Sequence, residues 1–254
     1  SRREGLDFVL AVGGGSVIDS AKAIAMGAAT GRDPWEFAST GTRPDKTLPV
    51  ATVLTLAASG SETSNSCVLT NEETKEKRGI TSETNRPVIS FLNPENTFTV
   101  SKFQTGCGIV DIMMHTLERY LTPEGGESDL TDRIAEGLLI AVRDAGRRAI
   151  ADPRDYEARA TLMWAGSVSH NDYTGCGRKR LFPVHKLEHE LSAFRDEIAH
   201  GAGLSVLFPA WAEHEMPYDY PRFAQFANRV LGVEMDFEHP ERTAREGIRT
   251  LRRF

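Results

Sequence analysis

The chain has 254 residues, of which 40% are hydrophobic and 26% charged, and its net charge at pH 7 is −6. These values are ordinary for a soluble globular enzyme with one large domain or two small ones. Lys and Arg are scattered rather than massed, and no apolar run approaches the roughly 20 residues of a membrane span. We therefore expect neither a nucleic-acid partner nor a membrane partner.

The three cysteines, Cys67, Cys107 and Cys176, lie far apart in the sequence and have no CxxC spacing. An odd count in a chain of this size argues against a disulfide framework and favours a reducing compartment. The first residues also lack the basic and apolar regions of a secretory signal. These features predict a cytoplasmic protein.

The first hundred residues alternate predicted strands and helices. A short apolar run that ends in glycines is typical of a buried parallel strand, and apolar residues at helical spacing follow it. The predicted elements are, in chain order, a strand at 7–12, a helix at 16–29, a strand at 49–56, a hairpin of 68–70 with 78–80, and a strand at 87–92. This order predicts an α/β fold with a doubly wound parallel sheet.

From residue 101 onward the strand signal disappears and helical patterns follow one another. We predict helices at 104–121, 128–150, 154–170, 183–194, 202–214 and 220–231. The shift in composition near residue 98 divides the chain into an α/β dinucleotide-binding domain at 1–98 and an all-helical metal-binding domain at 99–254. Ligands are expected in a cleft between the two. The glycine loop follows only one strand, so we expect the chain to be an internal segment of a longer protein.

Three consecutive glycines, 13–15, separate the first predicted strand from the first predicted helix. Backbone N–H groups at a helix N-terminus favour an anion, and the missing side chains let a diphosphate approach closely. In the simpler alternative, Ser16 caps the helix and Asp19 is its reciprocal partner, but this does not account for the glycines. The GxGxxG fingerprint is absent. A second loop of small and hydroxyl-bearing residues, 55–64, follows the next strand.

Two pairs of residues at a spacing of four suggest a metal site. Asp111 precedes His115, His185 precedes His189, and His200 stands at a predicted helix start. Residues i and i+4 share one face of a helix. A carboxylate among apolar neighbours is unfavourable unless it is paired or bound to a metal. We therefore predict a site for a divalent metal.

Oxygen and nitrogen ligands without a thiolate fit Fe(II), Zn(II), Mn or Co, and this ligand set does not choose among them. Lys186 follows His185, so the HExxH motif of metalloproteases is absent. The three remaining histidines are interpreted as hydrogen-bonded core or surface residues. They are His170, His214 and His239.

Four motifs together resemble the iron-containing alcohol dehydrogenase family, in particular its butanol-dehydrogenase-like branch. The motifs are GGGSVIDSAK at 13–22, GSE at 60–62, GxxDxxxH at 108–115, and HxxxH followed by HG at 185–201. The resemblance runs over essentially the whole chain. It implies an enzyme that transfers a hydride between NAD or NADP and a primary alcohol or aldehyde, and it suggests a homodimer.

The resemblance also implies roles for residues at matching motif positions. The metal ligands would be Asp111, His115, His185 and His200, holding Fe(II) or alternatively Zn(II), while His189 would lie beside the nicotinamide as a proton-relay group. The cofactor-binding residues would be Gly14, Gly15, Ser16, Asp19, Thr55, Ser59, Ser64, Ser66 and Lys77. The chain departs from the family pattern in a segment before His200 that is one residue longer than usual, and in having Ala199 where a Pro is common.

Two other functions are compatible with the same residues. One is a zinc-dependent enzyme similar to glycerol dehydrogenase or dehydroquinate synthase. The other is a catalytically incomplete segment that binds a metal without turnover. Metal content and turnover of the chain discriminate among the three.

Overall fold

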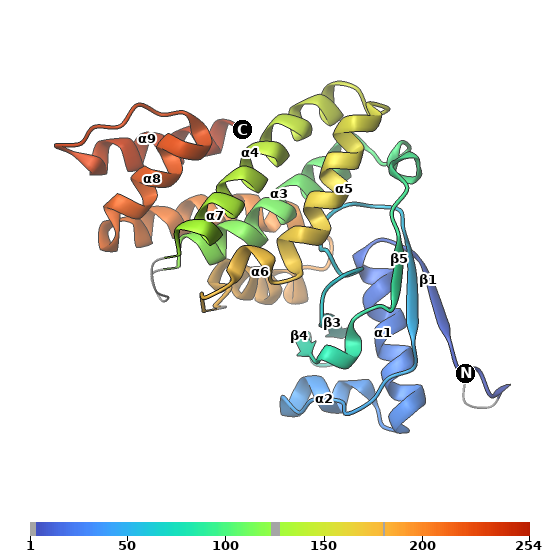
Figure 1. Ribbon diagram of the computed structural model, residues 1–254. Coiled ribbons are helices and arrows are strands. Elements are labelled where there is room, and N and C mark those ends of the chain that lie inside the picture. Colours follow the sequence, from blue (N-terminus) through green and yellow to red (C-terminus); the bar gives the residue numbers. More distant parts are fainter. Residues whose placement is uncertain (1–3, 123–127, 180) are drawn as a thin grey trace.

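The computed structural model describes residues 4–122, 128–179 and 181–254, which form an α/β part followed by a helical part (Figure 1). The α/β part contains β1 (Val9–Gly13), α1 (Gly15–Thr30), α2 (Pro34–Thr40), β2 (Val50–Leu54), β3 (Ser66–Asn71), β4 (Glu76–Thr81) and β5 (Ile89–Phe91). The helical part contains α3 (Lys102–Tyr120), α4 (Asp129–Ala151), α5 (Tyr156–His170), α6 (Pro183–Phe194), α7 (His200–Glu215), α8 (Tyr220–Leu231) and α9 (Pro240–Arg253). The predicted fold class is confirmed, and no described helix is long and apolar enough to cross a membrane.

The strands β1, β2 and β5 form a parallel sheet in that order, and β3 and β4 form a separate antiparallel hairpin. The register pairs Gly13 with Leu54, so the loops that follow β1 and β2 start side by side at the carboxyl edge of the sheet. Leu10 and Val12 are more than half exposed, so the prediction that 7–12 is a buried strand was wrong for one of its two faces. The reason is that α1 packs on one face of β1 only, and no described residue covers the other.

The helix α1 lies between the parallel sheet and the hairpin. Ile18 and Ala25 belong to one apolar cluster with residues of β1 and β2. Met26 belongs to a second cluster, with Cys67 of β3 and Ile80 of β4. A helix covered on both sides in this way holds the sheet and the hairpin in one unit.

The short helix α2 was not predicted, although its start carries a clear local signal. Asp33 is the N-cap, and its carboxylate accepts a hydrogen bond of 2.9 Å from the backbone N–H of Trp35. Pro34 follows at the first helical position, where its missing N–H removes no hydrogen bond. The Asp-Pro pair is therefore a helix-start signal that the analysis of apolar periodicity overlooked.

The helix α3 is the centre of the helical part. Its residues Ile112, Met113 and Leu117 are at most 1% exposed and belong to the largest apolar cluster, together with residues of α4, α5, α7 and α8. Because neighbours surround α3, polar residues on its inner faces are also withdrawn from water. This placement explains how Asp111 and His115 come to lie in the interior.

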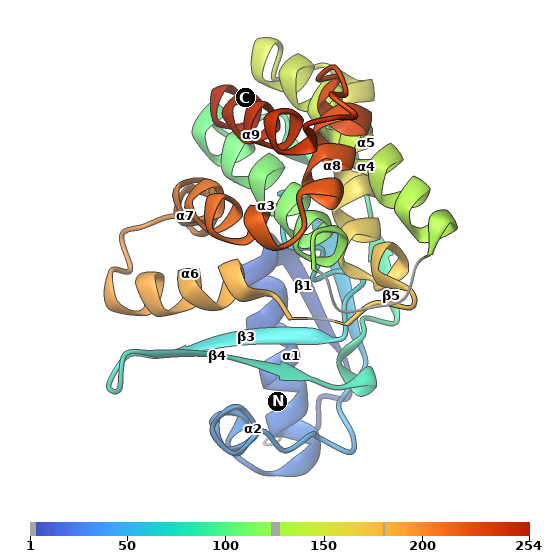
Figure 2. The same ribbon diagram turned by 90° about the vertical axis from the view of Figure 1, so that its left-hand side faces the viewer.

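The two parts meet along the hairpin and the loop that follows β2. Figure 2 shows α6 running alongside the β3–β4 hairpin, and the Lys77 ammonium of β4 donates a hydrogen bond of 2.9 Å to the Ser192 hydroxyl of α6. Further along, the Ser167 hydroxyl of α5 donates to the buried Glu62 carboxylate at 2.6 Å. These contacts hold the helical part against the α/β part at the carboxyl edge of the sheet.

Candidate functional site

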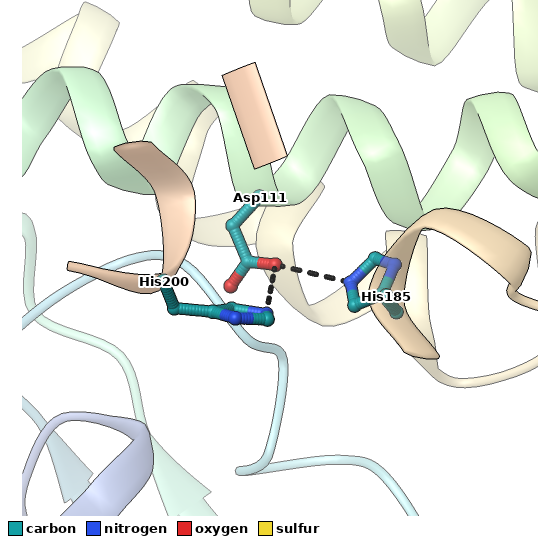
Figure 3. A group of neighbouring side chains, drawn as sticks. All are labelled: Asp111, His185 and His200. Carbon is teal, nitrogen blue, oxygen red and sulfur yellow. Dashed lines mark ion pairs between the residues drawn. The ribbon is translucent and has the colours of Figure 1, made fainter. Parts of the chain in front are cut away.

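The four predicted metal ligands lie close together, with a nitrogen of each of the three histidines near one carboxylate oxygen of Asp111. The Nε2 atoms of His185 and His200 lie 3.4 and 3.7 Å from Asp111 Oδ1, as Figure 3 shows. The Nδ1 atom of His115 is 3.6 Å from the same oxygen, and its ring is stacked on that of His185. Three separate helices, α3, α6 and α7, thus contribute to one cluster.

The position of His200 depends on the glycine that follows it. A Cβ on Gly201 would stand 2.1 Å from the backbone oxygen of Cys107 on α3. Only glycine therefore allows the first turn of α7 to lie this close to α3. Since Cys107 is one helical turn before Asp111, this contact brings the ring of His200 next to the carboxylate.

Several polar atoms at the centre of the cluster are buried without a hydrogen-bond partner among the described residues. They include Asp111 Oδ1, His115 Nδ1 and His185 Nε2. Such groups are strongly unfavourable in an interior unless they have a partner. Ligand atoms bonded to a divalent ion at about 2.1 Å stand roughly 3–3.5 Å apart in a tetrahedral site, close to the separations here. The residues therefore fit a divalent metal.

Two buried glutamates that were not predicted from the sequence accept hydrogen bonds from the histidines, on the side of each ring away from Asp111. The Glu118 carboxylate of α3 accepts a hydrogen bond of 2.9 Å from His185 Nδ1. The Glu188 carboxylate of α6 accepts one from His200 Nδ1. Both glutamates follow a predicted ligand by three residues in the same helix, and this spacing is the signal that could have identified them.

The charges around the two central histidines differ in their effect. Burial by itself lowers the pKa of His185, but the carboxylates of Asp111 and Glu118 outweigh it and raise this pKa to about 9. The pKa of His115 is lowered, first by burial and then by the neighbouring histidines. Without a metal, His185 therefore carries a positive charge at neutral pH, whereas His115 is neutral.

The predicted catalytic residue His189 lies beside the cluster, on the side facing the α/β part. Its ring centroid is 5.5 Å from that of His200 and 6.4 Å from that of His185. Burial, and then the positive charge of Lys77, lower the pKa of His189 to about 3. The residue is therefore neutral at pH 7, with one ring nitrogen free of a proton.

One histidine that the sequence analysis interpreted as core or surface lies at the site. The ring of His170 is 4.1 Å from that of His115 between centroids, and its Nε2 is 3.1 Å from the Ser66 hydroxyl. It had no partner at helical spacing, so only the tertiary structure brings it here. His214 and His239 are exposed and far from the cluster in the fold, as expected of surface residues.

The glycine loop meets α1 as predicted, but the capping alternative is wrong. The N-cap of α1 is Gly14, which has no side chain to cap with, and Ser16 lies inside the helix. Asp19 instead accepts hydrogen bonds from the Ser61 hydroxyl at 2.5 Å and the Val68 backbone at 2.9 Å. The carboxylate of Asp19 therefore connects α1 to the second loop and to β3 rather than to Ser16.

The second predicted cofactor loop lies against the first. A Cβ on Gly15 would stand 2.4 Å from the Ser59 hydroxyl oxygen, and the Thr55 backbone N–H donates to the Gly13 oxygen at 3.1 Å. The hydroxyls of Ser64 and Ser66 are 3.1 Å apart. The last predicted cofactor residue, Lys77, lies on strand β4, where the hairpin contacts α6, between these loops and the metal cluster.

The Lys22 side chain binds this second loop through backbone oxygens. Its ammonium is buried and donates to the backbone oxygens of Ser61, Ser64 and Ser66 at 2.6, 3.1 and 2.8 Å. Burial, opposed by the charge of Asp19, lowers the pKa of Lys22 to about 8. The ammonium consequently stabilises the second loop from the interior of the protein.

Comparison with known proteins covers both parts of the chain. Residues 1–94 match the family model described as iron-containing alcohol dehydrogenase, and residues 105–254 match that of the Fe-containing alcohol dehydrogenase family, C-terminal. NADH-dependent butanol dehydrogenase A of Clostridium acetobutylicum is 41% identical over 254 residues, which are 100% of this chain and 64% of that protein. NADPH-dependent aldehyde reductase YqhD of Escherichia coli is 34% identical over 91% of this chain and 60% of that protein.

Solved structures of related proteins are similar to this chain over nearly its whole length. NADH-dependent butanol dehydrogenase A of Thermotoga maritima superposes with a TM-score of 0.93 at 39% identity, covering 99% of this chain and 62% of that one. Escherichia coli YqhD superposes with a TM-score of 0.94 at 32% identity, covering 99% of this chain and 64% of that one. The chain thus spans less than two thirds of the length of the relatives named here.

Proposed function

The chain belongs to the iron-containing alcohol dehydrogenase family, and from this premise we propose that it transfers a hydride between NAD(H) or NADP(H) and a primary alcohol or aldehyde. The observation that carries the proposal is the convergence of three histidine nitrogens on Asp111 Oδ1, within 3.7 Å. This cluster of Asp111 and the three histidines lies on the side of the helical part that faces the glycine loop. A metal site next to a nucleotide loop is what metal-assisted hydride transfer requires.

We propose Asp111, His115, His185 and His200 as the metal ligands, with Fe(II) as the metal expected from the family and Zn(II) as the alternative. When bound, the metal supplies Lewis-acid polarisation of the substrate oxygen, and the nicotinamide gives or accepts the hydride. Asp111 and His185 are buried. Charges at these residues therefore interact more strongly than they would in water.

The proposed cofactor residues lie along the two adjoining loops. Gly14 and Gly15 present backbone N–H groups at the start of α1 to a diphosphate, and Ser16 adds an exposed hydroxyl there. Thr55, Ser59, Ser64 and Ser66 would follow the cofactor along the second loop, and Lys77 would meet it near α6. Asp19 would act through its hold on Ser61 rather than by direct contact.

His189 is proposed as the proton-relay group. Its imidazole is neutral at pH 7 because its pKa is lowered to about 3, so it has a lone pair to receive the alcohol proton and, as a weak base, would release that proton readily. General acid–base groups of this kind contribute roughly 10²–10⁴ in rate. The ring stands next to His200 and close to Lys77, between the metal cluster and the α/β part.

The proposal is tested with the 254-residue chain, purified without metal and loaded anaerobically with Fe(II) or Zn(II). We expect about one metal per chain and NAD(P)H-dependent reduction of butanal, with Asp111→Ala as the control that binds no metal. Faster turnover with zinc than with iron would favour the zinc-dependent alternative. Metal binding without turnover would contradict the enzymatic proposal for this chain and favour the metal-binding segment.

The homodimer suggested by the resemblance stays a proposal, and sedimentation velocity of the same sample tests it. A single species of twice the chain mass would support the dimer. A monomer with full turnover would show that the site does not depend on a second copy.

A further inference from the structure

Two of the three histidines that face Asp111 each donate a hydrogen bond to a buried carboxylate, and the described residues place no such carboxylate at the third, His115. Glu118 lies behind His185, and Glu188 lies behind His200. These glutamates are only 1% and 0% exposed, which is unusual for ionisable groups that are not at an ion pair or a metal site. Their burial therefore calls for a function.

The hydrogen bonds determine which nitrogen of each ring faces the cluster. An ionised carboxylate only accepts hydrogen bonds, so the Nδ1 atoms of His185 and His200 must carry the protons that they donate. In the neutral ring that binds a metal, Nε2 then carries the lone pair, and it lies on the side of Asp111 Oδ1, at 3.4 Å in His185 and 3.7 Å in His200. Histidines that bind metals commonly donate their other N–H to a carboxylate, which fixes the ring and raises its basicity.

Glu118 is held in place by the start of α6. Its two oxygens accept hydrogen bonds from the backbone N–H groups of Val184, at 3.2 Å, and His185, at 3.0 Å. No side chain of α6 itself caps this helix start. One carboxylate on α3 therefore caps α6 and orients the imidazole of the same residue, His185, whose backbone it binds.

Glu188 is held from the other side by Lys77, whose ammonium is 3.7 Å from Glu188 Oε2. Glu188, His189 and His200 also lie close enough together to hold a cation of their own. The Lys77 charge opposes a cation there, and the Nδ1 proton of His200 already faces the carboxylate. The geometry favours an orienting carboxylate over a second metal site.

We propose that Glu118 and Glu188 are positioning residues that fix the Nδ1–H tautomer and the ring orientation of His185 and His200 for metal binding. The inference rests on the proposed function, because it assumes that these histidines are ligands. It also gives Lys77 a second role, since its ammonium lies 3.7 Å from Glu188 Oε2 and helps to hold this carboxylate beside His200.

The test compares Glu118→Gln, Glu188→Gln and Glu190→Gln in the full 254-residue chain. Glu190 is an exposed residue of α6 and serves as the matched control. Zn(II) and Co(II) affinities are measured by competition with a chromophoric chelator. We expect both buried variants to lose roughly 10–100-fold in affinity, and the control to bind like the wild type.

A second readout separates orientation from mere folding. In the Co(II)-loaded wild type, we expect the Nδ1 protons of His185 and His200 to give paramagnetically shifted, exchangeable proton NMR signals. Glu188→Gln should move or broaden the His200 signal and leave the His185 signal in place, which a general loss of stability would not do. If Glu118→Gln fails to fold because α6 loses its cap, Glu188→Gln still carries the test.

The outcomes distinguish the inference from the proposed function. Wild-type affinity and unchanged signals in Glu188→Gln would overturn the inference while leaving the metal ligands in place. A wild-type chain that binds neither Zn(II) nor Co(II) would overturn the proposed function, and with it the inference.

Discussion

The metal cluster and the cofactor loops are built on opposite principles. The cluster consists of large ionisable side chains whose central atoms have no hydrogen-bond partner among the described residues. The loops consist largely of glycines and small residues, and Lys22 binds three backbone oxygens in the second loop and at the start of β3. The centre of the cluster is left without hydrogen-bond partners among the described residues, whereas the loops are held together by hydrogen bonds within the protein.

This difference determines which substitutions matter in each region. In the cluster, function depends on the identity of a side chain, so removing one donor atom removes the site. In the loops, function depends on the absence of side chains, so adding a single methyl group blocks the site. The four predictions below use this contrast, from the largest expected effect to the smallest.

The largest effect is expected in the cluster. His185→Ala should abolish both metal binding and turnover, because it removes a central donor atom. His189→Ala should keep the metal and lower turnover by roughly 10²–10⁴. Metal content by mass spectrometry, measured beside butanal reduction, checks both. A His189→Ala chain that loses its metal would show that His189 is a ligand rather than a relay group.

In the glycine loop, Gly15→Ala should weaken cofactor binding tenfold or more, because the new Cβ would stand 2.4 Å from the Ser59 oxygen. Overpacking of this kind costs about 1–3 kcal/mol. Gly106→Ala is the matched control, since a Cβ there meets nothing within 4 Å. Titration of NADH fluorescence measures the dissociation constant, and the second substitution Ser59→Gly should restore part of the loss. Unchanged affinity in Gly15→Ala would contradict the close approach of the two loops.

Lys22→Met should destabilise the fold at pH 7 by about 1–3 kcal/mol, because three buried backbone oxygens lose their donor. The pKa of Lys22 is about 8 in the folded protein, against an ordinary value of 10.5. Between these pH values the unfolded chain holds more protons, so the stability that depends on Lys22 rises with pH, by at most about 3 kcal/mol. Urea unfolding at pH 7 and pH 10 measures both effects. Lys102→Met, at an exposed site, should leave both the stability at pH 7 and its change with pH as in the wild type. If the stability of the wild type rises with pH no more steeply than that of Lys22→Met, the lowered pKa of Lys22 is disproved.

The smallest effect on stability is expected for Ser16→Ala. Loss of an N-cap serine costs about 1 kcal/mol, but the cap of α1 is Gly14, so the change should stay within about 0.5 kcal/mol. Cofactor affinity should nevertheless fall if the exposed hydroxyl binds the diphosphate. Thermal unfolding together with NADH titration separates the two. A stability loss of 1 kcal/mol or more would restore the capping interpretation.

Most helices and strands were predictable because their signals are local. Apolar periodicity placed α1 and α3 to α8 within a few residues of their observed ends, and the hairpin was predicted at 68–70 with 78–80. The exposure of one face of β1 was not predictable, because burial depends on what packs against a strand rather than on its own residues. The helix α2 was missed because seven residues are too few to show a period.

By itself, the sequence determined the fold class, the glycine loop and the ligand spacings of Asp111, His115 and His185. Each is a pattern within one element, where the backbone geometry of a helix or strand converts spacing into direction. Only the tertiary structure decided that His170 lies at the site and that Glu118 and Glu188 contact two of the proposed ligands, His185 and His200. These contacts depend on how three helices pack, and the packing depends on close approaches such as that of Gly201 to Cys107.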